Sequence, residues 1–480
     1  MIRSTFFLIL FFCLFFNCTN QLIKPYPYKK AEVKVSSVEK DTTDEVDFGK
    51  AFDSQSTGQF IPLLKQDSLP KGNQNIGQHT AQTGNQVISF RYPPFEVARP
   101  FVRVLLKQKV NRAAFYSTGN VEMHSSKGKV MVFRGRCLVQ LGSASVLETE
   151  ATWGKMDFQL PCTLVSKNEL NLIDVEENSY RGSIIISNDK KGFLSLINSV
   201  DIEEYLRGVV PLEIGKLGNS AIEALKSQAI AARTYTYQRI GDQAQNYFDL
   251  YPTTADQVYG GANVEYREAD LAIRLTKNLV LVYNDSIARA YYHSTCAGRT
   301  ANIEDVWSNK PALPYLRSVS DLDSSGAAYC RGSKQFKWEE SWTREKFSQY
   351  VDKGLKVLDP RRDFRGLVKD LRVTSTFDCG RVRSCRITSD NWTYECGGDI
   401  IRSVFRRPLA GDPILRSAKF TVTHGSGMIR LSGTGYGHGV GMCQCGAIAR
   451  ANSGQSFETI LKAYYKGIVI CTATFLDQLN

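Results

Sequence analysis

The sequence is poor in histidine, with five in 480 residues, and none of the five stands in an HExxH motif. That motif presents two histidines on one helical face with a glutamate between them, as zinc peptidases do. Its absence argues against a peptidase of that class. The chain also lacks the glycine spacing of Walker and Rossmann phosphate loops, and it has no fixed-period repeat. A phosphate-loop protein and a solenoid are therefore not expected.

Basic arms are lacking as well. The formal net charge is +12, yet the chain has no basic arm with interleaved aromatic residues and no nucleic-acid fold motif. We therefore expect no nucleic-acid partner. For an exported chain, an anionic polymer or surface such as the bacterial cell wall suits this charge better. The alternative is a basic surface that only maintains solubility.

Long hydrophobic runs are limited to the N-terminus, where residues 6–16 are almost unbroken apolar. This run is too short to span a bilayer comfortably. Arg3 before it and a polar exit after it predict a signal peptide over residues 1–18. Cys18 resembles the lipid-modification site of bacterial lipoproteins, although residues 15–17 depart from the usual Leu-Ala-Gly box. Ordinary cleavage nearby, with Cys18 incidental, is the alternative.

Residues 19–98 have little periodic apolar pattern and include the polar segment KGNQNIGQHTAQTGNQ (71–86). Such a composition cannot bury enough apolar surface to fold alone, so we predict a flexible tether. Together with the signal peptide and Cys18, it predicts an exported protein of the cell envelope, attached to a membrane by a lipid anchor.

Cysteine is more abundant, with twelve residues in all. Ten remain after Cys13 and Cys18 of the N-terminal segment are set aside. In an exported protein these would form disulfides by default. Their connectivity cannot be deduced from the sequence.

Folded sequence is predicted to start near residue 99. Residues 99–200 contain short strands with alternating apolar residues and form a β-rich N-terminal part, whereas helical patterns enter within 201–476. Strands and helices are segregated rather than alternating. We therefore predict an α+β fold with a central amphipathic helix and a C-terminal helix.

The central helix is predicted over residues 219–240, with Ser220 and Glu223 as a capping box. Its apolar stripe at helical spacing consists of Ala221, Leu225, Ala229, Ala232 and Thr236. A shorter helix over 200–215 is expected to begin at Asp201 and to end at Pro211. Further expected elements are two strands around Asn284-Asp285, a helix over 340–358, short strands over 367–432 and a terminal helix over 456–467 capped by Ser456.

Glycine is concentrated in residues 433–447, GTGYGHGVGMCQCGA, at every second position from Gly433 to Gly441. Because glycine is the most costly residue to order, this pattern predicts backbone that lies very close to a neighbouring group, with His438 projecting into a site. A plain glycine-rich loop is the alternative.

Six motifs occur in order: EEYLRGVVPLEIG, EALKSQAIAARTYTY, TTADQVYGG, YYHSTCAGRT, GTGYGHGVGMCQCGA and ILKAYYKG. Together they resemble the stage II sporulation protein D/amidase enhancer (SpoIID/LytB) family, over roughly residues 100–476. The resemblance implies a lytic transglycosylase of peptidoglycan that requires no cofactor. Such enzymes cleave between N-acetylmuramic acid and N-acetylglucosamine, prefer glycan strands stripped of stem peptides, and leave 1,6-anhydro ends.

Glu213 is the predicted catalytic residue, since the family's glutamate lies in the motif that VVPLEIG matches. A lytic transglycosylase needs one carboxyl group that is protonated at working pH, which an apolar setting favours. The flanking valines, Pro211 and Ile214 can supply that setting. The alternative is a surface glutamate at a helix end. Glu203 and Glu204 are expected to be solvated or to cap the helix.

The substrate-binding candidates come from three motifs. Arg233 is expected to bind a muramic-acid carboxylate or, equally, to form a structural ion pair. Gln257 and Tyr259 could hydrogen-bond to sugar and stack on it. His438 and Gln444 match the family's GHGVGxxQ motif, and with Tyr436 they are expected to face Glu213, with His438 donating to sugar or to Glu213. A structural histidine in a glycine corner is the alternative.

The metal candidates are His293, Cys296, Cys330 and Cys443, which offer the nitrogen and sulfur ligands of a structural zinc site. A Cys296–Cys330 disulfide or inert buried thiols are the alternatives, and Cys445 has no assigned role. For the whole protein, the competing function is a non-catalytic module that grips glycan strands and stimulates a partner N-acetylmuramoyl-L-alanine amidase, as the family's second name implies.

Overall fold

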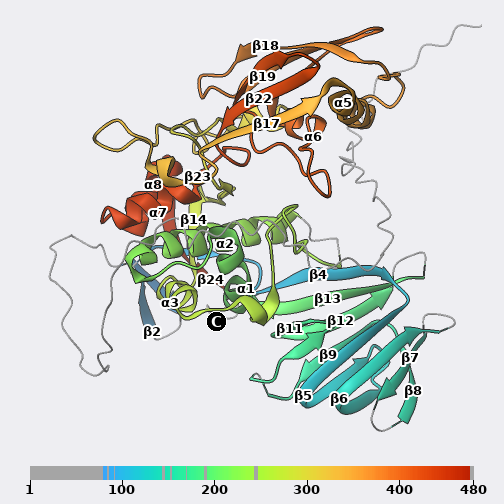
Figure 1. The fold of residues 1–480 in the computed structure, drawn as a ribbon. Coiled ribbons are helices and arrows are strands. Elements are labelled where there is room, and N and C mark those ends of the chain that lie inside the picture. Colours follow the sequence, from blue (N-terminus) through green and yellow to red (C-terminus); the bar gives the residue numbers. More distant parts are fainter. Residues whose placement is uncertain are drawn as a thin grey trace, which may run out of the picture. The chain divides into compact units, whose positions relative to one another are not determined.

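The computed structural model describes residues 79–83, 86–90, 92–142, 146–151, 154–168, 170–188, 192–242 and 247–475 (Figure 1). All of them lie in one compact unit, Asp47–Asn480. The predicted signal peptide, Cys18 and most of the predicted tether lie outside the described residues. Within the described part of the chain, no helix has both the length and the apolar character needed to cross a membrane.

A ten-stranded sheet forms the β-rich N-terminal part (Figure 1). Buried and exposed residues alternate along its strands, so one face supplies core residues such as Phe115, Met123 and Phe133. The strands run in the order β4-β13-β12-β9-β5-β6-β7-β8, and β10 pairs with both β5 and β11. Their bounds are β4 (Phe101–Val110), β5 (Arg112–Ser125), β6 (Val130–Leu141), β7 (Val146–Ala151), β8 (Gly154–Gln159), β9 (Cys162–Ser166), β10 (Ile173–Val175), β11 (Asn178–Tyr180), β12 (Ser183–Asn188) and β13 (Leu194–Asp201).

Regular structure begins before residue 99, earlier than the sequence pattern predicts. Strand β3 (Pro94–Glu96) pairs in parallel with the C-terminal strand β24 (Val469–Thr474), which the local sequence around β3 does not reveal. Strands β1 (His79–Thr83) and β2 (Gln86–Phe90) pair as a separate antiparallel hairpin.

The sheet that contains β24 and β3 also holds a hairpin predicted from the sequence. Its order is β15-β14-β24-β3, with β14 at Leu279–Tyr283 and β15 at Ser286–Ile287. Asn284 and Asp285 connect β14 to β15 with φ angles of 44° and 54°. Two consecutive positive φ angles are those of a tight hairpin turn, which Asn and Asp tolerate. The predicted turn is therefore confirmed.

Helix α1 (Ile202–Ile214) directly follows β13, and Asp201 caps it by accepting a hydrogen bond from the backbone N–H of Glu203. Pro211 lies inside the helix, so the prediction that it ends the helix is wrong. Proline removes only one backbone donor. The helix instead ends at Ile214, and Gly215 follows it with a φ of 87°, which suits glycine.

Helix α2 (Ile222–Asp242) contains four of the five residues of the predicted stripe, and the fifth, Ala221, directly precedes it; all five are buried. The helix is not amphipathic, because residues 229–232 are completely buried around its circumference. It contacts α1, α3 (Arg267–Leu275), α7 (Gln444–Asn452), α8 (Phe457–Tyr464) and β14 (Figure 1).

The start of α2 also differs from the predicted capping box. A short 3-10 helix, η2 (Asn219–Ala221), precedes it. Glu223 accepts a hydrogen bond from the backbone N–H of Phe457 (2.8 Å), and its other oxygen contacts Lys226. The carboxylate therefore ties α2 to α8. Ser456 caps α8 as predicted, by accepting a hydrogen bond from the backbone N–H of Thr459.

A second hydrophobic core lies within the range 201–476, which the sequence pattern treats as one region. Its buried members all fall between Trp338 and Leu431, and Trp342, Phe347 and Phe405 are among the largest. Two three-stranded sheets, β17-β22-β21 and β18-β19-β20, contribute to it. The elements are β17 (Lys337–Thr343), α5 (Arg344–Leu358), β18 (Val368–Thr376), β19 (Val382–Ser389), β20 (Thr393–Cys396), η5 (Gly398–Ile400), α6 (Ile401–Val404), β21 (Phe420–Gly425) and β22 (Met428–Thr434).

The chain returns from this second core to the first through the glycine-rich stretch. There β23 (Met442–Cys443) pairs in parallel with β16 (Tyr292–His293). The remaining short helices are η3 (Gly261–Val264), α4 (Ile303–Val306) and η4 (Tyr329–Gly332).

Candidate functional site

Glu213 lies in the last turn of α1 and is half-buried. Val209, Val210 and Ile214 around it are completely buried, as the sequence pattern indicates, whereas Leu212 is 37% exposed. One carboxyl oxygen, Oε1, accepts a hydrogen bond from the backbone N–H of Val258 (2.8 Å). The end of α1 therefore presents a carboxyl group in an apolar wall.

Burial raises the pKa of Glu213 from 4.5 to about 7, although hydrogen bonds from the Val258 backbone and the Gln444 side chain act in the opposite direction. Desolvation dominates because the charged carboxylate loses its water and the described residues supply it with no ion pair. The group is therefore poised to hold or release a proton near neutral pH.

Gln444, the first residue of α7, is brought to Glu213 from the far end of the chain. Its side chain is 4% exposed and hydrogen-bonds to the Glu213 carboxyl group. Its amide nitrogen also lies 3.3 Å from Oε1 of Gln228 on α2. The structure thus unites the VVPLEIG motif with the GHGVGxxQ motif.

Gln257 supports this site from behind and is completely buried. Its Oε1 accepts hydrogen bonds from Thr236 (3.0 Å) and Tyr205 (3.3 Å). Its Nε2 donates to the hydroxyl of Tyr292 (3.0 Å) and to a backbone carbonyl of α2. With these groups engaged, Gln257 positions its neighbour Val258 and is not available to hydrogen-bond to sugar, contrary to the sequence prediction.

Tyr259 and Arg233 are also interior residues, which corrects both expected contacts with substrate. The Tyr259 ring lies 4.8 Å from that of Tyr205, and its hydroxyl donates to Asn198 (2.8 Å). Arg233 is completely buried and forms a two-pronged ion pair with Glu203 (2.8 and 2.6 Å). The alternative of a structural ion pair therefore holds for Arg233, and Glu203 is neither solvated nor capping.

His438 makes its hydrogen bonds to backbone groups rather than to Glu213. Its Nδ1 accepts a hydrogen bond from the backbone N–H of Val440 (3.1 Å), and the ring also hydrogen-bonds to the backbone of Tyr292. Burial lowers the pKa of His438 to about 4, so the ring is neutral. His438 is therefore a structural histidine within the glycine-rich stretch. Its half-buried ring packs near the rings of Tyr291 and Trp307.

The glycine stretch lies against residues 291–301. Tyr436 is half-buried, and its backbone exchanges hydrogen bonds with Thr295 (2.9 and 3.0 Å). A Cβ at Gly441, where φ is 71°, would lie 2.0 Å from the carbonyl oxygen of Tyr291. At Gly439 a Cβ would meet the guanidinium of Arg381 at 2.3 Å. Close backbone packing therefore explains the glycines, as the pattern predicts.

A chain of half-buried aromatic rings, which the sequence pattern did not indicate, extends beside the Glu213 site. Tyr291 lies 6.2 Å from Tyr235, 4.9 Å from Trp307 and 6.3 Å from His438, measured between ring centres. Trp307 in turn lies 4.9 Å from His438. Tyr292, next to Tyr291, is close enough to Glu213 for that carboxylate to raise its pKa further, after burial as the main cause. The two adjacent tyrosines of the YYHSTC motif, Tyr291 and Tyr292, are the sequence feature that could have indicated this aromatic chain.

Comparison with known proteins identifies the family to which this site belongs. The family described as Stage II sporulation protein (SpoIID) matches residues 190–283, which include Glu213 and Val258. An uncharacterized protein of Brachyspira hyodysenteriae (strain ATCC 49526 / WA1) is 30% identical over 276 residues, which are 57% of this chain and 68% of the relative. The chain belongs to the SpoIID family.

Two other relatives carry descriptive names. The amidase enhancer of Bacillus subtilis (strain 168) is 29% identical over 344 residues, which are 62% of this chain. The chain spans about half the length of that relative, 47%. The stage II sporulation protein D of the same strain is 28% identical over 304 residues, which are 59% of this chain and 78% of the relative.

This SpoIID member also matches a domain of unknown function (DUF8618) over residues 327–441. That range contains the whole second core, from Trp338 to Leu431. Gln444 lies just beyond it. The two residues that meet at the carboxyl site therefore lie on either side of the second core in the sequence.

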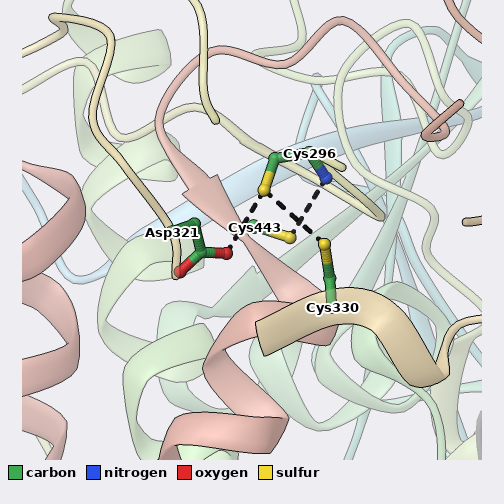
Figure 2. Close-up of side chains that lie close together, drawn as sticks. All are labelled: Cys296, Asp321, Cys330 and Cys443. Carbon is green, nitrogen blue, oxygen red and sulfur yellow. Dashed lines mark hydrogen bonds between the residues drawn. The ribbon is translucent and has the colours of Figure 1, made fainter. Parts of the chain in front are cut away.

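The metal candidates of this SpoIID chain are only partly brought together. Cys296, Cys330 and Cys443 converge, but the fourth member of the cluster is Asp321 (Figure 2). His293 is not a member. Its Nδ1 lies 3.2 Å from the backbone oxygen of Val440. The sequence offered no signal for Asp321, because its proximity depends on the path of the loop between residues 307 and 329.

Disulfides are not formed among the described residues, where all ten cysteines are free and buried. The Sγ atoms of Cys296 and Cys330 lie 3.7 Å apart, well beyond the S–S bond length of about 2.05 Å. The alternative of a Cys296–Cys330 disulfide is therefore wrong for this structure. Cys445 lies beside the cluster, with its Sγ 3.6 Å from the Thr295 hydroxyl.

Proposed function

We propose that this protein acts on the bacterial cell wall as a lytic transglycosylase that cleaves peptide-stripped glycan strands, with Glu213 as acid and then base. The observation that carries the proposal is the setting of Glu213, a half-buried carboxyl group in an apolar wall that the described residues leave without a cation. Burial there raises its pKa to about 7. A general acid is most effective when its pKa lies near the working pH.

In the proposed reaction, the protonated Glu213 donates its proton to the glycosidic oxygen as the bond from that oxygen to the muramoyl anomeric carbon breaks. The C6 hydroxyl of the same muramoyl residue then attacks the anomeric carbon. The Glu213 carboxylate accepts the hydroxyl proton. The products are a 1,6-anhydro end and a new free hydroxyl on N-acetylglucosamine, and Glu213 regains its starting protonation state.

Two hydrogen bonds support both halves of this cycle. The Val258 N–H and the Gln444 side chain hold the carboxyl group in place, and they stabilise its charged form once the proton has left. Burial raises the pKa of Glu213 and the two hydrogen bonds lower it, so the pKa stays near neutral. A group that first donates and then accepts a proton requires such an intermediate pKa.

A mechanism with one carboxylate is favoured over hydrolysis, which normally uses two. Asp256, the acidic residue of the TTADQVYGG motif, is held by other partners. It forms an ion pair with Arg239 (2.9 Å) and accepts hydrogen bonds from the hydroxyl of Tyr235 (3.0 Å) and the backbone N–H of Tyr251 (2.9 Å). It is therefore poorly placed to activate water.

The aromatic chain supplies surfaces for sugar. Tyr235, Tyr291 and Trp307 are half-buried rather than core residues. An aromatic side chain combines apolar area with a rigid shape at low entropic cost, which suits the apolar faces of sugar rings. With His438 at its edge, this chain replaces Gln257 and Tyr259 as the proposed contact surface for the glycan.

The second candidate function is a non-catalytic module that binds glycan strands and stimulates an N-acetylmuramoyl-L-alanine amidase. The similarity to the amidase enhancer favours it. Export to the cell envelope and a lipid anchor at Cys18 belong to either proposal. The raised pKa of Glu213 favours the enzyme, because a binding module has no need for a destabilised carboxyl group.

The test is mass spectrometry of peptide-free glycan strands after digestion. We expect wild type to release fragments with 1,6-anhydro ends, and Glu213→Gln to release none while still binding strands in a pull-down. Glu345→Gln, an exposed glutamate on α5, is the matched control and should retain full activity.

Fragments with ordinary reducing ends would contradict the transglycosylase mechanism. Strand binding without any cleavage by wild type, together with stimulation of an added amidase, would establish the second candidate instead.

A further inference from the structure

We propose that Cys296, Cys330, Cys443 and Asp321 bind one zinc ion as a structural centre with three sulfur ligands and one oxygen ligand. The proposal does not include Glu213 among the ligands and does not depend on the proposed enzymatic activity. Its first support is that the four buried side chains place one ligand atom each within 4.8 Å of all the others (Figure 2).

The spacing of the ligand atoms fits a tetrahedral ion. Zinc–sulfur bonds of about 2.3 Å at tetrahedral angles place two sulfur atoms about 3.8 Å apart. The Sγ atoms of Cys296 and Cys330 lie 3.7 Å apart. Zinc–oxygen bonds are shorter, so a sulfur–oxygen pair should lie closer, and Cys296 Sγ lies 3.2 Å from Oδ2 of Asp321.

Backbone N–H groups point at two of the three sulfur atoms, as they do toward thiolate ligands of a metal. Cys443 Sγ accepts hydrogen bonds from the backbone N–H groups of Cys296 (3.2 Å) and Gly446 (3.3 Å). It also caps the N-terminus of α7, where the helix dipole stabilises negative charge. The backbone N–H groups of Gly298 and Ala297 bond to the Cys330 sulfur. Thiolate is the form of cysteine that binds metal.

Asp321 is held so that one of its oxygens faces the cluster. Its Oδ1 accepts hydrogen bonds from the hydroxyl of Tyr464 (2.9 Å) and from Arg450 (3.0 and 3.1 Å). Its Oδ2 faces Cys296, as Figure 2 shows. Outer partners of this kind orient a carboxylate ligand of a metal.

Charge balance gives the same answer. Three thiolates and one carboxylate carry four negative charges, which is costly in a buried cluster unless cations are present. Arg450 supplies one positive charge at Asp321. Lys419, whose ammonium group donates to the backbone carbonyl of Ala297 (3.2 Å), supplies another. The buried guanidinium of Arg381 also interacts electrostatically with Cys296, and a divalent cation would neutralise further negative charge. Among common divalent ions, zinc prefers tetrahedral, sulfur-rich sites.

The zinc centre would hold together chain segments that also position Gln444 against Glu213. Cys296 follows β16, and Cys443 is the last residue of β23, the strand that pairs with it. Cys443 also immediately precedes Gln444, which bonds to Glu213. Asp321 and Cys330 come from the segment that leads toward the second core. An ion here would therefore fix the start of α7.

The first experiment measures metal in the full chain purified under reducing conditions. We expect about one zinc per chain by elemental mass spectrometry. Replacement of zinc by cobalt(II) should produce intense thiolate-to-cobalt charge-transfer absorption and the visible bands of a tetrahedral cobalt ion. Wild type that contains no zinc and yields no such absorption would overturn the proposal, as would a native Cys296–Cys330 disulfide found by peptide mapping.

The second experiment compares variants. Cys330→Ser and Asp321→Asn should bind zinc at least about tenfold more weakly than wild type in competition with a chromophoric chelator. Cys137→Ser, which changes a buried free cysteine of β6, is the matched control and should keep wild-type affinity. If Cys330→Ser retains wild-type zinc affinity, the assignment is wrong. If either cluster variant fails to fold, the cobalt spectrum of wild type decides the question.

Discussion

Helix α1 carries a glutamate near each end, and the two have opposite surroundings. Glu203, in the first turn, forms an ion pair with the buried Arg233 and accepts a hydrogen bond from the backbone N–H of Asn278 (3.1 Å). Glu213, in the last turn, accepts hydrogen bonds from neutral donors, Val258 and Gln444, and its pKa is raised to about 7. One helix thus holds an ion-paired carboxylate and a carboxyl group whose pKa is raised.

The difference shows what a cation does for a buried carboxylate. Beside Arg233, negative charge is an advantage, and the pair ties α1 to α2. Beside neutral donors, negative charge is costly, so the proton stays on the carboxyl group. Four predictions test this contrast, beginning with the largest expected effect.

Glu203→Ala should destabilise the protein by about 3–5 kcal/mol, because it leaves the buried charge of Arg233 unpaired. Chemical denaturation at neutral pH measures this loss. The matched control is Glu204→Ala, whose side chain is 39% exposed and whose ion pair with Arg207 should contribute no more than about 1 kcal/mol. Equal losses for the two variants would mean that the buried pair has no special role.

Glu213→Gln should stabilise the folded protein at alkaline pH. The folded-state pKa of Glu213 lies near 7 and the ordinary value is 4.5. The folded state therefore binds more protons than the unfolded state between these values, and its stability falls as pH rises through them. Above about pH 7 the free energy of unfolding of wild type should be lower by about 3 kcal/mol than at acidic pH.

Denaturation curves at about pH 4 and about pH 8 test this sign. The variant should match wild type at the lower pH and exceed it at the higher pH. A difference between variant and wild type that is the same at both values would show that the pKa of Glu213 is not raised.

Cleavage of glycan strands should depend on the same proton. The first step requires the protonated form of Glu213, so kcat/KM should fall as pH rises through about 7, by about tenfold per pH unit beyond it. The pH profile on peptide-free strands measures this. A flat profile between about pH 6 and pH 9 would exclude Glu213 as the acid of the rate-determining step.

Gln444→Met should have the smallest effect. It removes a hydrogen bond that lowers the pKa of Glu213, so that pKa should rise. One hydrogen bond contributes about 0.5–1.5 kcal/mol, which shifts the alkaline limb of the pH profile upward by roughly 0.5–1 unit. Gln140→Met, on an exposed position of β6, is the control. A downward shift would contradict the role assigned to Gln444.

Local sequence patterns predicted the features that depend on neighbours along the chain. The stripe of α2, the Asn284-Asp285 turn and the Ser456 cap are all present. Family motifs predicted Glu213 and Gln444 as site residues. Neither kind of pattern separated the second core from the first, because the apolar periodicity of its strands and helices is the same as that of any other core.

Residues that depend on distant partners were assigned less well. Arg233, Gln257 and Tyr259 lie in motifs and have polar groups, which the sequence pattern interprets as substrate contacts. Each is buried against partners from other segments, such as Glu203, Tyr292 and Asn198. A polar side chain in a motif can serve the fold or the ligand, and only its accessibility distinguishes the two.

The sequence by itself determined the family, the α+β class and the central helix, and it predicted Glu213 as the catalytic candidate, because each depends on local pattern or on ordered motifs. Only the tertiary structure decided that Glu213 lacks a cation while Glu203 has one, that His438 bonds to the backbone, and that Asp321 completes the cysteine cluster. The physical reason is that desolvation and ion pairing depend on which distant segments meet, and folding alone brings those segments together.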